Sequence, residues 1–154
     1  MQITPIIHDE VNRNNPIAVD IIITYDQKIY DKLIEKSAKE WFSEKEDFKN
    51  INGELCQFFE KVWTPGQHVS NETIDVSQSI IATLFSKFVS TKKRIGGVVF
   101  ANYIYSYKYA EKNSFRHVIH SDEFKYGMQI NLGKEDFKVK SLKPANHGFW
   151  RKYL

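Results

Sequence analysis

The sequence predicts a mainly β protein, a two-sheet β-sandwich with one amphipathic helix inserted after the first strand. Three observations support this fold class. Short β-branched and aromatic runs recur between turn signals, and only residues 27–48 show strong helical periodicity. The seven glycines and four prolines are spread between segments rather than gathered into a linker. With 154 residues, the chain is expected to form a single domain over residues 1–154.

The longest apolar and aromatic run is Ile95–Tyr109, which we expect to be a central strand. Its first half is apolar at odd and even positions, whereas its second half is apolar or aromatic mainly at odd positions. Alternate residues of a strand face opposite sides, so this pattern predicts a strand that leaves the core towards solvent. Gly96 and Gly97 disfavour a helix and indicate a bulge or a close backbone approach.

The chain before this run supplies a second strand and the helix. Ile17–Tyr25 follows the polar, turn-like residues 11–16 and is almost continuously apolar, which predicts a buried strand. In residues 27–48, apolar side chains recur every three or four positions with Lys and Glu mostly between them. This spacing predicts one amphipathic helix, anchored by Trp41 and ending near Asn50–Gly53.

The rest of the chain consists of short strand-like segments separated by turns. Thr64–Gln67 is a strong turn signal because proline fixes φ and glycine accepts a positive φ. Gly133 and Lys134 mark a possible hairpin turn. Ser79–Val89 is ambiguous between strand and helix, with strand preferred, and the aromatic tail Asn146–Leu154 is expected to dock on the body. The other strand-like segments are Glu54–Trp63, His68–Val76, Ser114–His120, Tyr126–Leu132 and Phe137–Leu142.

Composition limits the compartment and the partner only weakly. No window reaches the roughly 18 apolar residues that a membrane-spanning helix needs, and the first ten residues do not resemble a signal peptide. Cys56 is the only cysteine, so no intramolecular disulfide is expected, and its apolar neighbours favour a buried structural thiol. Residues 1–60 hold 12 acidic and 7 basic side chains, whereas residues 61–154 hold 7 and 15. The basic residues 61–154 could bind an anionic partner such as nucleic acid or anionic lipid. The alternative is that their lysines lie on strand edges and prevent aggregation.

No pattern in the sequence predicts catalysis, a cofactor or a metal site. A Walker loop and a G-x-S-x-G nucleophile motif are both lacking, and the carboxylates of residues 35–47 are explained by an exposed helix surface. His117 and His120 form an H-x-x-H pair, but on a strand these two side chains would point to opposite faces. The sequence therefore predicts a protein without enzymatic activity, without cofactors and without a metal.

An alternative function is a small binding module, with nucleic acid as a candidate ligand. Four tyrosines (Tyr103, Tyr105, Tyr107 and Tyr109) alternate along the predicted strand, and lysines and arginines lie nearby in the sequence. Aromatic side chains on a sheet can stack on single-stranded bases. The competing interpretation is that the tyrosines cover an edge of the core with their hydroxyl groups in water. We consider nucleic acid the less favoured partner.

Five segments follow one another in an order that points to a known family. They are a polar lead with a proline into a hydrophobic strand (Asn12–Tyr25), a helical insertion with spaced aromatics (Tyr30–Phe48), a strand with a Pro-Gly turn (Val62–Gln67), an I-G-V-V-A-type strand (Ile95–Tyr103) and an aromatic-Arg strand (Phe115–Ile119). In this order they resemble the outer-membrane lipoprotein of type VI secretion systems, the TssJ family. The resemblance covers residues 11–120; residues 77–94 look like an insertion, and residues 121–154 are a possible C-terminal extension.

The resemblance implies a transthyretin-like β-sandwich on the periplasmic face of the outer membrane. Such a protein would dock the periplasmic domain of an inner-membrane channel component, without catalysis. A lipid anchor would require a precursor with a cysteine upstream of Met1; without export, the chain would be cytoplasmic. In the family, a loop after the first strand contributes to docking, which on this sequence falls at Asp26, Gln27, Lys28, Ile29 and Tyr30.

Overall fold

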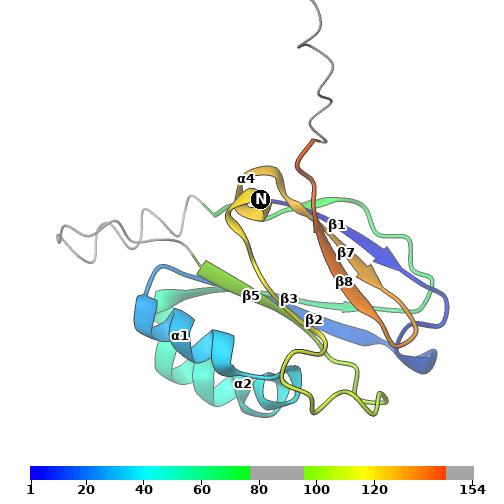
Figure 1. Cartoon of the computed structure of the whole chain (residues 1–154), viewed down its shortest axis with the longest axis horizontal. Helices are drawn as coiled ribbons and strands as arrows, with labels where there is room; N and C mark the ends of the chain where they lie inside the picture. Colours follow the sequence, from blue (N-terminus) through cyan, green and yellow to red (C-terminus); the bar gives the residue numbers. More distant parts are fainter. Residues whose placement is uncertain (77–95, 145–154) are drawn as a thin grey trace, which may run out of the picture.

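The computed structural model describes residues 1–76 and 96–144, and they form three stacked layers (Figure 1). Two four-stranded sheets pack face to face, and two helices cover the outer side of one of them. The predicted two-sheet sandwich is confirmed, with strands dominant and more helix than expected. The first sheet has the order β4 (Glu72–Thr73), β1 (Gln2–Ile7), β7 (Met128–Leu132), β8 (Phe137–Ser141). The second has the order β3 (Cys56–Trp63), β2 (Ile17–Thr24), β5 (Gly96–Ala101), β6 (Arg116–Val118).

Strand β2 is the centre of the second sheet, as its apolar run predicts. It pairs antiparallel with β3 over all eight of its residues, from Ile17 opposite Trp63 to Thr24 opposite Cys56, and with β5 on its other side. The sheet lies between the helices and the other sheet, so both faces of β2 are covered (Figure 1). This explains why seven of its eight residues are buried and why the sequence shows no polar alternation.

The predicted single helix is wrong, because two helices occupy this region. α1 spans Gln27–Glu35 and α2 spans Ala38–Asn52, with a break at Lys36 and Ser37. The Ser37 hydroxyl accepts a hydrogen bond from the Glu40 backbone N–H (3.2 Å), and the Glu40 carboxylate accepts one from the Ser37 N–H (2.7 Å). This reciprocal capping box starts a new helix at that point. The predicted end near Asn50–Gly53 is confirmed.

Trp41 fixes α2 to the sheet. Its indole is fully buried and stacks against the ring of Phe100 at a centroid distance of 5.3 Å, with Phe58 at 6.3 Å and Phe48 edge-on at 5.4 Å. The indole N–H donates a hydrogen bond to the Asp20 carboxylate of β2 (2.9 Å).

The Asp20 carboxylate is also paired with a lysine from α2. Lys45 Nζ lies 3.0 Å from Asp20 and 2.9 Å from Glu60 of β3. Burial raises the pKa of Asp20 above its usual value, and the hydrogen bonds from Trp41 and Lys45 oppose that rise. This network is a polar link between the helix layer and the sandwich, which explains the one acidic residue in an apolar strand.

The predicted long strand Ile95–Tyr109 is wrong in extent. β5 ends at Ala101, and the chain then turns, with the Ser106 N–H donating to the Tyr103 carbonyl (2.9 Å). The expected close backbone approach at its start is confirmed. A Cβ at Gly97 would lie 2.7 Å from the Ile22 carbonyl oxygen of β2, so a larger residue would separate the two central strands.

Two elements were not predicted, and both lie outside the apolar runs. β1 pairs parallel with β7, from Ile3 opposite Met128 to Ile7 opposite Leu132, while the other strand pairs of the described residues are antiparallel. A short helix, α4 (Ser121–Tyr126), leads into β7. Residues 121–144, separated above as a possible extension, thus supply α4 and half of the first sheet.

The predicted turns are confirmed, whereas some predicted strand segments are shorter in the structure. Gln67 N–H donates to the Thr64 carbonyl (3.1 Å) with Gly66 at φ 66°, and the Gly133 N–H donates to the Asp136 carbonyl (2.8 Å) in the β7–β8 hairpin. Within His68–Val76, only the two residues of β4 are strand. Ser79–Val89 and Asn146–Leu154 lie outside the described residues. None of the helices in the described part has the length and apolar character to cross a bilayer.

Candidate functional site

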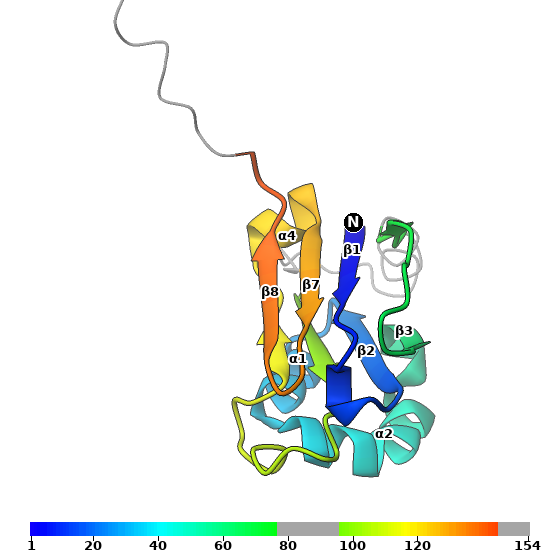
Figure 2. The same ribbon diagram turned by 90° about the vertical axis from the view of Figure 1, so that its right-hand side faces the viewer.

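Four connections meet at one end of the sandwich, which we call the loop end (Figure 2). The loop end comprises residues 8–16, Thr64–Gln67, Asn102–Ser114 and Gly133–Asp136. A backbone hydrogen bond from the Gly66 N–H to the His8 carbonyl (3.2 Å) links Thr64–Gln67 to residues 8–16. Another, from the Asn102 N–H to the Ala18 carbonyl (2.9 Å), links Asn102–Ser114 to β2. In Figure 2 the β1–β2, β5–β6 and β7–β8 connections lie at the lower end, opposite the N-terminus and α4.

The β1–β2 connection has an unusual, locally stabilised backbone. Asn12, Arg13 and Asn14 have φ values of 47°, 54° and 64°, a left-handed conformation that asparagine tolerates better than most residues. The buried Asn12 side chain donates to the Pro16 carbonyl (2.9 Å), and the Asn15 side chain donates to the Arg13 carbonyl (2.9 Å). A loop held in one shape loses little entropy when a partner binds.

The exposed face of this connection is charged and borders the β7–β8 turn. The Arg13 guanidinium contacts the Glu135 carboxylate at 2.8 Å. A shallow pocket of about 440 Å³ lies between the two connections, lined by His8, Asp9, Glu10, Gly133, Lys134 and Asp136. Its side chains carry both signs of charge, which suits polar contacts at the rim of a protein interface.

The β5–β6 connection contributes exposed apolar and aromatic side chains. Ile104 is 53% exposed, Tyr105 48% and Tyr107 76%, the last with Lys108 Nζ 5.6 Å from its ring centroid. Exposed tyrosines are typical of residues that dominate binding energy at protein interfaces.

The alternating tyrosines do not form a stacking platform, which corrects the expectation behind the nucleic-acid alternative. Tyr103 is fully buried and Tyr109 is half-buried, whereas Tyr105 and Tyr107 are exposed on a turn-rich connection. Because β5 ends at Ala101, the four side chains do not share a strand face.

Tyr103 connects the β5–β6 connection to the β7–β8 hairpin. Its single hydroxyl proton is shared between the carbonyls of Gly133 (3.0 Å) and Asp136 (2.9 Å), and its ring stacks on Phe115 at a centroid distance of 4.3 Å. Burial, and to a lesser extent the charge of Asp136, raises the pKa of Tyr103 well above its ordinary range. The hydroxyl therefore remains a hydrogen-bond donor at any physiological pH.

Replacing Tyr103 by phenylalanine is expected to lower the free energy of unfolding by about 1–2 kcal/mol, because the Gly133 carbonyl loses its hydroxyl donor and the Asp136 carbonyl keeps only the Gly133 N–H. Urea unfolding followed by circular dichroism measures this change. Tyr107→Phe is the matched control, since that hydroxyl belongs to a side chain that is 76% exposed. Equal effects of the two substitutions would contradict a link between these connections.

The predicted docking residues Asp26–Tyr30 lie at the other end of β2 and are mostly helical. Asp26 is the N-cap of α1, and its carboxylate accepts hydrogen bonds from the N–H groups of Lys28 (2.9 Å) and Ile29 (3.1 Å). Ile29 is buried, and the Tyr30 ring packs over Gly96. Gln27 and Lys28 are the exposed members of this segment, so they offer a smaller surface than the expected loop.

The structure corrects the expected orientation of His117 and His120. Their rings lie 5.3 Å apart, because His120 is not on a strand but immediately precedes α4. His117 Nε2 lies 2.8 and 2.9 Å from the two Glu123 oxygens, and the Glu123 carboxylate also accepts the His120 backbone N–H (2.8 Å). Over residues 1–76 and 96–144, no group of three or more His, Cys, Asp or Glu side chains is arranged to hold a metal ion.

Cys56 is partly buried at the start of β3. Burial raises the pKa of its thiol to about 11, which the hydrogen bond with Thr24 opposes. A thiol with so high a pKa contains little thiolate at neutral pH and is a poor nucleophile.

Comparison with solved structures identifies what the fold resembles. A scan against protein-family models and a search of curated proteins found no match. The structure matches Lip of Serratia marcescens, a membrane-bound component of the type VI secretion system, with a TM-score of 0.52 and 13% identity over 90% of this chain and 95% of that one. It matches the lipoprotein TssJ1 of Pseudomonas aeruginosa with a TM-score of 0.55 and 14% identity over 94% and 95%. The chain has a TssJ-like fold.

A third match comes from another structure of a type VI secretion protein. It is a chain in the structure of the TssM C-terminal domain from EAEC, with a TM-score of 0.54 and 14% identity over 94% of this chain and 96% of that one. The resemblance predicted from the ordered motifs is thus confirmed at the level of the fold. The similarity also covers more of the chain than residues 11–120.

Proposed function

We propose that this protein is a non-enzymatic structural adaptor of a bacterial type VI secretion apparatus. The observation that carries the proposal is the TssJ-like fold over at least 90% of the chain. Its role is to hold the periplasmic domain of an inner-membrane channel component at the periplasmic face of the outer membrane. A scaffold with a dense core, rigid connections and exposed interface-type side chains suits such a role.

The loop end is the favoured docking surface. In the TssJ family a loop after the first strand contributes to docking, and the first strand of this structure is β1 rather than β2. We therefore propose residues 8–16, at the loop end, as the docking connection in place of Asp26–Tyr30. Residues 8–16 are preorganised by their own hydrogen bonds, and Tyr105 and Tyr107 add exposed aromatic surface at the same end.

The position of the N-terminus agrees with this orientation. Met1 lies at the end of the sandwich opposite the β1–β2 and β7–β8 connections (Figure 2). A lipid carried on a segment upstream of Met1 would leave the domain from that end. The loop end would then face away from the outer membrane, towards a partner that reaches across the periplasm.

Binding of the partner's purified periplasmic domain, measured by calorimetry, tests both surfaces. Tyr105→Ser/Tyr107→Ser is expected to weaken binding at least tenfold, because hot-spot side chains contribute about 2 kcal/mol or more. Gln27→Ala/Lys28→Ala, the matched double substitution at the start of α1, is expected to change affinity by less than about twofold. The reverse result would place docking at Asp26–Tyr30, and absence of binding by the unaltered chain would refute the adaptor role.

A further inference from the structure

Residues 102–115 join β5 to β6 as a long connection without a helix or a strand. Connections of more than about 12 residues that lack regular structure are usually either functional or disordered. This one is ordered, because the N–H groups of Ser106 and Tyr109 donate to the carbonyls three residues before them. Its shape therefore decides how its exposed side chains are presented, which are those of Ile104, Tyr105 and Tyr107.

Arg116, the first residue of β6, joins this connection to the helix layer. Its Nη1 group donates hydrogen bonds to the carbonyls of Ile34 and Lys36 (3.0 Å to the latter), and Nη2 donates to the Asn113 side chain (3.1 Å). The two carbonyls lie at the C-terminal end of α1, where carbonyls lack partners within the helix and a positive charge is favourable. One guanidinium group thus links α1, β6 and the β5–β6 connection.

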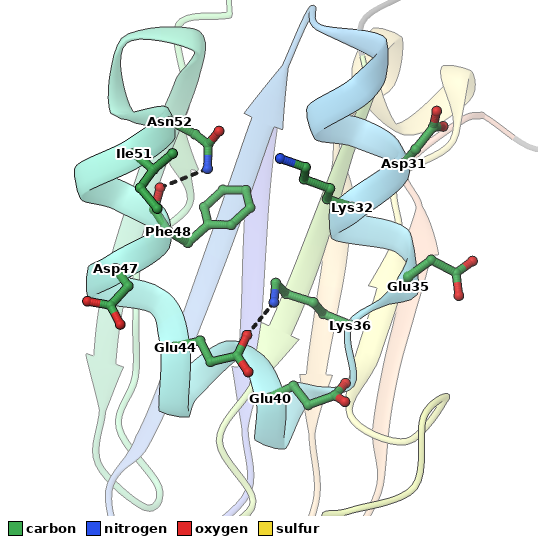
Figure 3. Close-up of a pocket in the computed structure, with 10 residues that line it drawn as sticks. All are labelled: Asp31, Lys32, Glu35, Lys36, Glu40, Glu44, Asp47, Phe48, Ile51 and Asn52. Atoms are coloured by element: carbon green, nitrogen blue, oxygen red, sulfur yellow. Dashed lines mark hydrogen bonds and ion pairs between the residues drawn. The ribbon is translucent and has the colours of Figure 1, made fainter.

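A second contact joins the connection to the same end of α1. Lys112 Nζ lies 2.5 Å from the carboxylate of Glu35, the last residue of α1. In Figure 3 the Glu35 side chain points away from α2, whereas Lys36 points towards α2 and pairs with Glu44. Both side chains of the Lys112–Glu35 pair are at least half exposed, so solvent weakens this contact and Arg116 is the stronger link.

The residue immediately before Arg116 has a strained backbone. Phe115 has a φ of 58°, a left-handed conformation that is rare for a bulky side chain. Its ring is buried and stacks on that of Tyr103 at a centroid distance of 4.3 Å. Such a conformation persists only where the surrounding structure holds it, and it is found mainly at functional sites. Here the Tyr103 ring and the hydrogen bonds of Arg116 hold it.

We propose that Arg116 is a positioning residue that holds the β5–β6 connection in the one conformation that presents Tyr105 and Tyr107 to the docking partner. This role rests on the proposed function, because the partner is the same periplasmic domain. The Arg116 guanidinium is bound to α1 and Asn113, so its effect on docking passes through the connection. A connection that is already ordered loses less entropy when a partner binds.

Hydrogen exchange of the free chain tests the positioning without the partner. Arg116→Gln is expected to speed amide exchange at Ser106 and Tyr109 about tenfold and to leave the amides of β2 unchanged. Arg116→Lys keeps the charge but not the planar set of donors, so it should give the same change, and it carries the test if Arg116→Gln does not fold. Lys61→Gln is the matched control and should change neither region, since Lys61 pairs with Glu72 at 2.7 Å outside the connection.

Calorimetry with the partner's purified periplasmic domain tests the effect on docking. Arg116→Gln is expected to weaken binding about tenfold in the unaltered chain, but less than about twofold when Tyr105→Ser/Tyr107→Ser is already present. A general structural role would give equal losses in both backgrounds.

The proposal is overturned if those losses are equal, or if the Arg116 variants leave exchange in the connection unchanged. It is also overturned, with the proposed function intact, if the unaltered chain binds and Arg116→Gln binds equally well. Absence of binding by the unaltered chain refutes the proposed function and the docking role of Arg116 with it.

Discussion

Replacing Trp41 by alanine is expected to lower the free energy of unfolding by about 3–5 kcal/mol, as for other buried large aromatic residues. The indole is completely buried between the rings of Phe58 and Phe100, and Phe48 meets it edge-on. Alanine would leave a cavity between α2 and the sheet. It would also remove one hydrogen bond from the buried Asp20 carboxylate, which adds to the cost.

Urea unfolding followed by circular dichroism measures this effect without relying on tryptophan emission. Trp41→Phe should have an intermediate effect, because it keeps a ring but loses the donor to Asp20. Ile51→Ala is the control on the same helix and should change stability by no more than about 0.5 kcal/mol, since that side chain is 79% exposed. A loss below about 1 kcal/mol for Trp41→Ala would show that α2 is not fixed by this residue.

Glu123→Gln is expected to lower the free energy of unfolding by about 2–3 kcal/mol at neutral pH, as for loss of hydrogen bonds to a charged group. Glu123 is 3% exposed, and its carboxylate contacts His117 of β6 and the backbone N–H of His120. Glu123 therefore links β6, at the edge of the second sheet, to α4, the helix that leads into β7 of the first sheet. The amide cannot accept hydrogen bonds at both of its polar atoms, so part of this network is lost.

The same carboxylate makes the stability depend on pH. Burial alone would raise the pKa of Glu123, but the hydrogen bonds from His117 and His120, with their charges, lower it below the usual 4.5. A group with a lowered pKa in the folded state stabilises the fold above its ordinary pKa, and this contribution disappears as the pH falls through the folded value. The free energy of unfolding of the unaltered chain should therefore decrease below about pH 4.5. That of the Glu123→Gln variant should decrease less steeply over the same range, because the variant lacks this carboxylate.

Asp122→Asn is the matched control for both measurements. Its side chain is 48% exposed and pairs with Lys143 at 3.1 Å on the surface. Surface pairs of this kind contribute about 1 kcal/mol or less. If the two substitutions had the same effect at neutral pH and in acid, the contact between His117 and Glu123 would have no structural role.

Local patterns allowed several elements to be predicted because each depends on residues close in sequence. β2 and β3 were visible as β-branched and aromatic runs, and the Thr64–Gln67 turn as a Pro-Gly pair. The break between α1 and α2 also has a local signal, the S-x-x-E capping box of Ser37 and Glu40. It was missed because the apolar periodicity continues across the break.

Other elements depend on partners that are distant in the chain. β1 contains Pro5, and a proline disfavours a strand that has neighbours on both sides because it has no backbone N–H to donate. In this structure β4 pairs only with Gln2 and Ile3, so Pro5 costs no backbone hydrogen bond to β4. The loop end likewise could not be recognised, since it gathers connections that are up to about 120 residues apart, as the Arg13–Glu135 pair shows. The predicted docking residues Asp26–Tyr30 follow β2, whereas the first strand of the fold is β1, which the apolar runs do not reveal.

The sequence by itself determined the sandwich class, the central strand β2, the principal turns and the order of motifs behind the TssJ-like fold. These follow from side-chain alternation, φ restrictions and apolar runs, which are properties of neighbouring residues. Only the tertiary structure decided where Ile95–Tyr109 leaves its sheet, which tyrosines are exposed, and how Arg116 joins the β5–β6 connection to the end of α1. Those features depend on which distant segments pack together, because burial and pairing are set by the whole fold rather than by one segment.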